Sequence, residues 1–185
     1  MQGDSRCKQC KIVADRIFIR ERARFDQAEI VARNISIKEN VSLNGIYFAQ
    51  DTIEINVNNI QEKKNVFILQ GHKTSDVDYI GKLSIQKLKA KDAAVLFLGD
   101  NWDETLRGIP VEISENTDIT GTLVANGIVD FRGKLKGSMT VSNLSFYEGE
   151  TLWRGFMRGG QIKGDTSVHV MLPDNIFFGG EPSYE

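Results

Sequence analysis

The sequence predicts an all-β protein, a single-stranded parallel β-helix (β-solenoid) of triangular cross-section with about 18 residues per turn. Apolar residues recur at a constant interval of six from Val13 to Ile55, and several recur again at an interval of eighteen. The spacings of three and four that mark a helix are not sustained, and β-branched residues dominate. An antiparallel β-sandwich with evenly spaced strands is the alternative.

Residues 12–57 are the first regular segment. Side chains two residues apart in a strand point to the same face, so we expect apolar pairs to fill the inside of each flat side. The series at intervals of six comprises Val13, Ile19, Phe25, Val31, Ile37, Leu43, Ala49 and Ile55. The series two residues earlier, apolar in six of seven positions, comprises Ile17, Ala23, Glu29, Ile35, Val41, Tyr47 and Ile53.

The length of 185 residues predicts one domain over 1–185, ample for a sizeable core. Its segments are regular coils at 12–57, coils with loop excursions at 58–110, regular coils at 111–147 and a C-terminal cap at 148–185. The formal net charge of −2 gives no overall attraction to nucleic acid, so none is expected as a partner.

Membrane association is expected only through a segment absent from this chain, because no apolar run approaches eighteen residues. The polar start, Met1-Gln2-Gly3-Asp4, does not resemble a signal peptide. The abrupt start suggests that a leader or anchor has been removed.

Cys7 and Cys10 form a C-K-Q-C motif before the first coil. A zinc site needs two further ligands, and His72 and His169 are distant and lack ligand spacing. A thioredoxin-type redox motif needs a βαβ context, which the sequence does not suggest. A local disulfide or two free thiols is the favoured interpretation, and a disulfide would favour an extracytoplasmic location.

Arg16, Arg20, Arg22 and Arg24 are the candidate polyanion-binding residues. The last three alternate, which would place them on one face of a strand. Such a strip could bind acidic glycans, phospholipid headgroups or another polyanion. The alternative is an ordinary solvated face.

Residues 58–110 interrupt the repeat. An apolar strand at 65–70 (NVFILQ) precedes a polar loop at 71–78, and the coil resumes with Leu83 and Ile85. The loop contains His72, interpreted as an exposed loop histidine rather than a catalytic base because no Ser, Cys or acidic partner lies near it at a meaningful spacing.

A second excursion, at 99–108 (GDNWDETLRG), carries acidic and aromatic residues. Asp100, Asp103 and Glu104 could bind Ca²⁺, but the run lacks the order of a Ca²⁺ loop. Trp102 is expected to cover the coil, with a sugar-stacking role as the alternative.

Residues 111–147 form the second regular segment. Leu123, Val129, Leu135, Val141 and Tyr147 recur at six, as do glycines 121, 127 and 133, which predict corners with positive φ or close stacking. The pairs that recur at eighteen are Val111/Val129, Ile113/Phe131 and Leu123/Val141.

Residues 119–127 (ITGTLVANG) and 131–137 (FRGKLKG) resemble the bactofilins, bacterial polymer-forming cytoskeletal proteins. The resemblance lies mainly in 111–147 and implies a right-handed, triangular β-helix. The interruption at 58–110, the C-x-x-C start and the aromatic, Gly-rich end depart from that family. These departures favour a bacterial cell-envelope protein, periplasmic or surface-exposed, over a cytoplasmic one.

The segment 148–185 is expected to end the coil. Leu152, Trp153, Phe156 and Met157 would cover the last open turn and prevent pairing with another chain. The apolar run 176–178 would pack on this cap or belong to a longer protein.

We therefore expect a non-enzymatic structural or interaction module that self-associates or binds another protein, with no cofactor and no metal. The first alternative is a binding module for acidic glycans or other polyanions. The second is a hexapeptide-type acyltransferase, disfavoured because both histidines lie outside the regular segments and the hexapeptide start is missing.

Overall fold

The computed structural model describes residues 5–75, 79–99 and 109–164. Strands make up 74% of these residues and no helix occurs among them, so the prediction of an all-β protein is correct. No helix in this part of the chain is therefore able to cross a membrane. The strands are β1 (Arg6–Lys8), β2 (Lys11–Ile19), β3 (Arg24–Asp26), β4 (Ala28–Glu39), β5 (Gly45–Gln61), β6 (Asn65–Leu69), β7 (His72–Lys73), β8 (Tyr79–Ile80), β9 (Lys82–Phe97), β10 (Val111–Ile113), β11 (Thr117–Phe131), β12 (Lys134–Glu148), β13 (Thr151–Arg154) and β14 (Gln161–Lys163).

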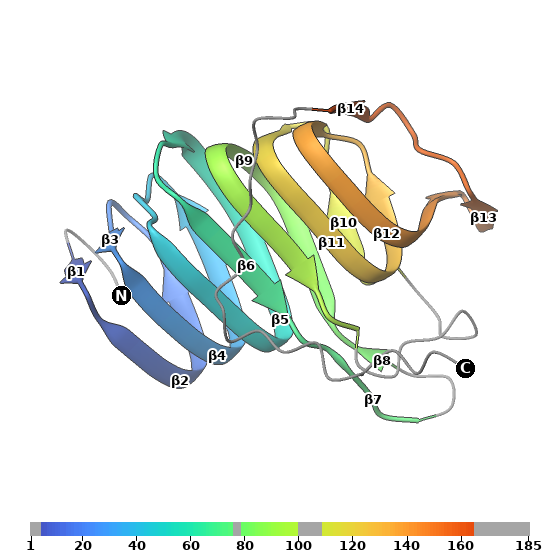
Figure 1. The fold of residues 1–185 in the computed structure, drawn as a ribbon. Coiled ribbons are helices and arrows are strands. Elements are labelled where there is room, and N and C mark those ends of the chain that lie inside the picture. The colour runs from blue at the N-terminus through green and yellow to red at the C-terminus, as the bar shows by residue number, and fades with distance from the viewer. Residues whose placement is uncertain (1–4, 76–78, 100–108, 165–185) are drawn as a thin grey trace, which may run out of the picture.

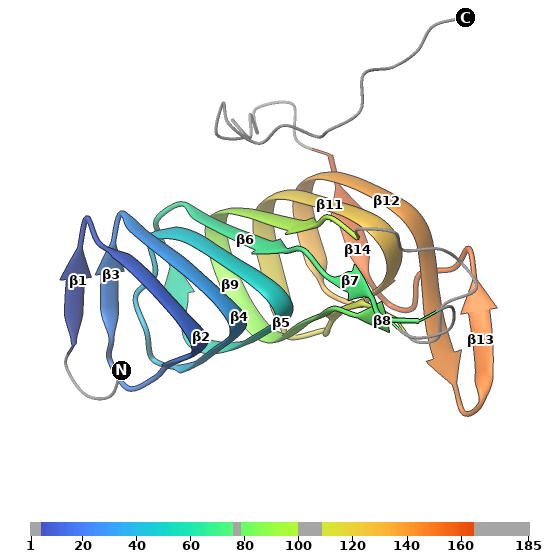
Figure 2. The same ribbon diagram turned by 90° about the horizontal axis from the view of Figure 1, so that it is seen from below.

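A ten-stranded sheet runs through the molecule in the order β13-β12-β11-β10-β9-β6-β5-β4-β2, with β14 beside β12. Its pairings are parallel except for β12 with β13, which are antiparallel. Two small sheets accompany it, the parallel pair β1–β3 and the antiparallel pair β7–β8. Long strands bend and stack in sequence order from the blue N-terminal end to the orange C-terminal end (Figures 1 and 2).

Equivalent apolar residues lie side by side along this stack. Ile17 pairs with Ile35, and Ile35 pairs with Ile53, as the interval of eighteen predicts. The same line of pairs continues through Leu83, Val111 and Val129. Because identical faces are repeated from strand to strand, the inward side chains form one continuous apolar ladder.

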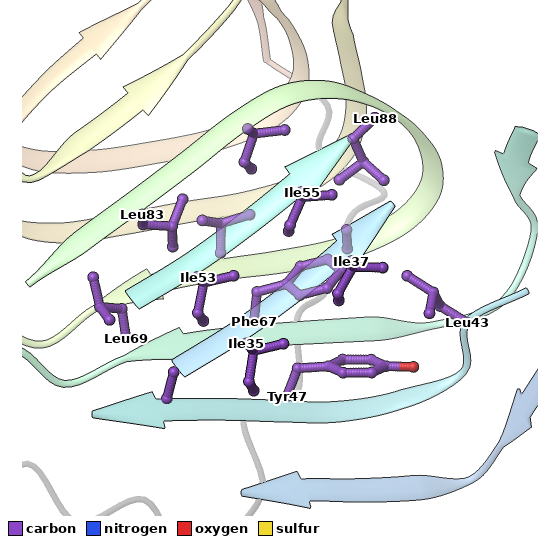
Figure 3. Close-up of a cluster of buried hydrophobic side chains, with 14 of the residues drawn as sticks. Ile35, Ile37, Leu43, Tyr47, Ile53, Ile55, Phe67, Leu69, Leu83 and Leu88 are labelled. Carbon is purple, nitrogen blue, oxygen red and sulfur yellow. The ribbon is translucent and has the colours of Figure 1, made fainter. Parts of the chain in front are cut away.

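The interior is filled by large apolar side chains. Figure 3 shows Ile35, Ile53 and Leu83 projecting into the same interior as the aromatic rings. The rings of Tyr47 and Phe67 stack with their centroids 5.3 Å apart. The core therefore continues across strands that lie far apart in the sequence.

The inward phase differs from the prediction on one side of the stack. Val13 is 66% exposed and Val31 is half-buried, whereas both were expected inside. Ile30 and Ala32 of β4 face the interior instead, with exposures of 0% and 6%. Inward positions in a regular strand are separated by one residue, but the bend between Ala32 and Ile35 places two residues between them. Such a shift of one residue moves side chains to the opposite face.

The number of sequence positions between paired residues is also less regular than the sequence predicts. Val111 pairs with Val129 and Ile113 with Phe131, as expected. The predicted pairing of Leu123 with Val141 is wrong, because Val141 pairs with Ala125. The chain advances five residues from Ile113 to Asp118 but only three from Phe131 to Lys134, so the pairs that follow are 16 rather than 18 positions apart.

Glycine is required at one bend that several strands share. Gly45, Gly121 and Gly137 have φ values of 153°, 148° and 145°. A Cβ on Gly121 would lie 1.8 Å from the carbonyl oxygen of Ala93, so the neighbouring backbone leaves no room for a side chain. Gly127 and Gly133 have no positive φ; close packing against Phe97 and Thr117 restricts them instead.

Both excursions leave the stack at the same bend. Gly71 N donates to Gln50 O and Gly99 N donates to Gln70 O, so three successive bends lie on one another. The strands β7 and β8 belong to the first excursion. The predictions for Asp100, Trp102, Asp103 and Glu104 lie outside the described residues, as do those for His169 and 176–178.

The predicted cap over the last strand is wrong for three of its residues. Trp153, Phe156 and Met157 are 44%, 58% and 36% exposed, and Leu152 is half-buried. The reason is that β13 folds back antiparallel beside the end of β12, at residues 145–148, and extends the strand sideways. Figure 2 shows this hairpin projecting from the C-terminal end of the stack.

Candidate binding surfaces

The four arginines proposed for polyanion binding do not share one face of a strand. Strand β2 ends at Ile19, and a turn with positive φ at Glu21 and Arg22 follows, so Arg20 and Arg22 lie in that turn. Arg24 begins β3, and the exposed Arg16 lies 3.7 Å from Asp15. Sequence alternation failed here because the chain turns where a continuous strand was assumed.

Two of the basic residues near the N-terminus are nevertheless neighbours. Arg6 of β1 pairs directly with Arg24 of β3, and both side chains are exposed. The guanidinium of Arg20 lies 5.5 Å from the ring centroid of Phe18, a cation–π contact. The arrangement is therefore a pair of adjacent arginines with a third held against an aromatic ring.

Cys7 and Cys10 are joined by a disulfide, with their Cα atoms 5.9 Å apart. The turn between them has a positive φ at Gln9, and both cysteines pack partly buried against the first end of the core. Within the described ranges, no three His, Cys, Asp or Glu side chains gather as a candidate metal site. The cysteines therefore close the bend where the chain enters the stack.

His72 has an acidic neighbour that its sequence surroundings do not reveal. Its Nδ1 lies 3.5 Å from Asp51 Oδ1, and Arg33 Nε lies 3.0 Å from Asp51 Oδ2. Only 11% of the Asp51 side chain is exposed. Stacked bends bring together residues separated by about twenty positions, and the cluster ties the first excursion to the body of the stack.

A hollow of about 320 Å³ lies on the outer face of the ladder near its C-terminal end. Strand β10 crosses its middle, and Tyr147 of β12 forms one wall. The polar lining comes from strands that are remote in sequence but adjacent in the sheet. The lining residues are Ser84, Ile85, Gln86, Ile109, Glu112, Ile113, Ser114, Asp130, Arg132 and Tyr147.

Each charged group of this hollow has an ionic partner. Arg132 Nε donates to both carboxylate oxygens of Asp130, at 3.0 and 3.1 Å, and its Nη2 also donates to Asp130. This hydrogen bonding raises the pKa of Arg132. Glu112 accepts a hydrogen bond from Lys82 at 2.6 Å. This hollow could not be predicted from the sequence, because no two of its charged residues form a recognisable motif.

The two ends of the ladder are the remaining candidate surfaces. In the part of the chain that the structure describes, β2 pairs along one edge only, with β4. At the other end, β14 pairs with Lys134–Lys136 and β13 with residues 145–148 of β12, which leaves 137–144 between them. The core side chains at the ends are only partly buried: Cys7, Cys10 and Ile12 at one, and Met139, Val141 and Leu144 at the other.

No family model, curated protein or solved structure matches this chain. We therefore infer function from the geometry of these surfaces.

Proposed function

We propose that this chain is a right-handed, triangular β-solenoid that stacks end to end with further copies of itself as a structural or interaction module. Paired residues fifteen to twenty positions apart support the solenoid where no excursion intervenes, as in Ile17 with Ile35 and Leu123 with Met139. The right hand of the coil is what the resemblance of 111–147 to bactofilins implies, whereas self-association is proposed from the ladder ends alone. The observation that carries the proposal is the pair of incompletely covered ladder ends.

Among the strands that the structure describes, none lies on the outer edge of β2 along Lys11–Ala14 at the first end. An unpaired edge presents a row of N–H and C=O groups to a further strand, and edges of this kind pair with other chains. Along β2, Ile12 is only half-buried and Ala14 is exposed, although their counterparts Ile30 and Ala32 are buried. A strand docked on this edge would complete the burial of both.

The second end offers a matching surface. Met139 and Val141 of β12 lie on the same line of paired residues as Ile12 and Ala14. Placing β12 of one copy beside β2 of the next would continue this apolar line at the usual strand spacing of about 4.8 Å. Because the two surfaces differ, the contact is heterologous and generates an open filament rather than a closed dimer.

The test is light scattering coupled to size-exclusion chromatography over a concentration series, with negative-stain imaging of the heaviest fraction. We expect mass to rise with concentration and filaments to form. Ala14→Lys should keep the protein monomeric, because a charged side chain would enter the apolar line at the junction.

Asp92→Lys is the matched control, since Asp92 is exposed on β9 in the middle of the stack. It should assemble like the unmodified chain. A monomer at every concentration, or equal loss of assembly in both variants, would contradict the proposal.

Polyanion binding is the second candidate function, supported by the adjacent arginines Arg6 and Arg24. Two neighbouring guanidinium groups can bind successive anionic groups of an acidic glycan, and such binding weakens as salt displaces it. Heparin affinity chromatography tests this directly. Elution of the Arg6→Ala/Arg24→Ala variant at the same salt concentration as the unmodified chain would exclude this pair.

A further inference from the structure

We propose that the hollow beside β10 binds a neutral saccharide of one or two rings, with Tyr147 as its stacking platform. This site is separate from the ladder ends and does not depend on self-association. Its volume of about 320 Å³ lies at the lower end of the ~300–1,000 Å³ typical of small-molecule sites.

The floor of the hollow is a regular array of polar side chains. Glu112 pairs with Ser84 on one side and with Asp130 on the other, so the three lie in one row across neighbouring strands. A second row follows two residues later along the chain: Gln86, Ser114 and Arg132.

This array combines hydrogen-bond donors and acceptors at short intervals. Neighbouring strands are about 4.8 Å apart, so each row places polar groups at a spacing that one sugar ring can span. Carboxylates accept, the guanidinium donates, and hydroxyl and amide groups do both. Vicinal sugar hydroxyls, which are themselves donors and acceptors, are matched by such a set.

The charge balance favours a neutral ligand over an ionic one. Asp130, with 7% of its side chain exposed, is neutralised by Arg132, and Glu112 is neutralised by Lys82. An anionic ligand would compete with Asp130 for Arg132, and a cationic ligand would compete with Lys82 for Glu112. A neutral polyol can instead use the outward hydrogen-bonding capacity of these groups without breaking either pair.

Tyr147 supplies the apolar contact that the polar floor lacks. Its side chain is 42% exposed at the wall of the hollow, and Ile109 is buried in the lining. The hairpin of β12 and β13 holds Tyr147 opposite Leu152, so its position is set by backbone pairing. An aromatic face at such a wall can pack against the C–H face of a sugar ring.

The experiment is a titration of the ¹⁵N-labelled full chain with maltose, cellobiose and N,N′-diacetylchitobiose. Binding is monitored by the NMR chemical shifts of the backbone amides. We expect at least one of these disaccharides to shift amides of 84–86, 112–114 and 130–132 in a saturable manner. Galacturonic acid and glucosamine, which are charged, should bind more weakly than the best neutral sugar.

Tyr147→Ala should raise the dissociation constant of that disaccharide about threefold to tenfold. Trp153→Ala is the matched control, because Trp153 is an exposed aromatic residue on the same hairpin that does not line the hollow. The proposal fails if no neutral disaccharide causes localised shifts, if a charged sugar binds best, or if Tyr147→Ala binds like the control.

Discussion

Gln61 occupies a core position between apolar neighbours. Its side chain makes hydrogen bonds to backbone groups that a neighbouring strand would otherwise make. It is 2% exposed at the end of β5. Its Oε1 accepts from Leu43 N at 2.8 Å, and its Nε2 donates to Val41 O at 2.9 Å. One side chain thus satisfies buried backbone groups where the parallel ladder lacks a regular partner.

We predict that Gln61→Ala destabilises the protein by about 1–3 kcal/mol, because it leaves Leu43 N–H and Val41 C=O unsatisfied. Denaturant unfolding measures the loss. The adjacent Glu62→Ala, which removes only an exposed ion pair with Lys91, should cost less than about 1 kcal/mol. Equal effects of the two substitutions would contradict this role for Gln61.

Ile37→Asp tests the inward register. Ile37 has no exposed surface and lies between Ile19 and Ile55 in the ladder, so aspartate would bury an unpaired charge. We expect no cooperative unfolding transition by circular dichroism. Ile37→Val should fold and lose only about 0.5–1.5 kcal/mol. An unchanged melting transition for Ile37→Asp would show that the register is wrong.

We predict that Asp26 adds a contribution to stability that depends on pH. The pKa of its carboxyl is lowered from 3.8, first by the hydrogen bond from Lys63 and then by that from Asn44, each 2.8 Å long. Because the folded-state pKa is depressed, the stabilisation is complete above the unfolded pKa and is lost as pH falls through the folded value.

Asp26→Asn should therefore flatten the decline in denaturation midpoint as pH falls below about 3.8. Lys63→Met should flatten it in the same direction by removing the largest cause of the shift. If the midpoints of Asp26→Asn follow those of the unmodified chain at every pH, this carboxyl does not contribute.

At the scale of elements, the excursion at 71–80 is an addition to a ladder that continues past it. Ala49 pairs with Leu69, and Thr52 pairs with Lys82. Two residues therefore form this bend in β5, whereas twelve residues lie between the equivalent positions after β6. The additional residues are held by Asp51 at His72 and by Tyr79, whose ring contacts Phe97 edge-on at 6.0 Å.

Deleting residues 71–80 should leave a folded protein, because Gln70 and Gly81 then bridge the bend as Gln50 and Asp51 do. We expect a loss of about 0.5–3 kcal/mol, close to that of Tyr79→Ala alone. Thermal unfolding of both variants checks this. A deletion variant that does not unfold cooperatively would show that the excursion is part of the core.

At the scale of the whole molecule, each strand contacts mainly its neighbours along the stack. β5 pairs with β4, β6 and β9, whereas β1 pairs only with β3 in the described part of the chain. In such an arrangement, stability is the sum of local and neighbour contributions, and the ends open first.

Hydrogen exchange should therefore show a gradient of amide protection. In the dilute monomer we expect the slowest exchange in β5 and β9 and the fastest in β1 and β3. Uniform protection from end to end would contradict this and indicate a single cooperative unit.

The sequence by itself determined the all-β class and the side-by-side pairing of residues such as Ile17, Ile35 and Ile53. These follow from local rules, since alternation and period depend on residues a few positions apart. The prediction for Val13 and Val31 failed because the inward phase depends on the length of each bend, which no apolar pattern records.

Only the tertiary structure decided which polar residues meet. Asp51 with His72, and Asp130 and Arg132 with Glu112 and Tyr147, come together because bends and strands distant in sequence are stacked. A shift of one residue at any bend would move these side chains to the opposite face of the sheet. The candidate surfaces are therefore consequences of register, which is set by the packing of the whole ladder.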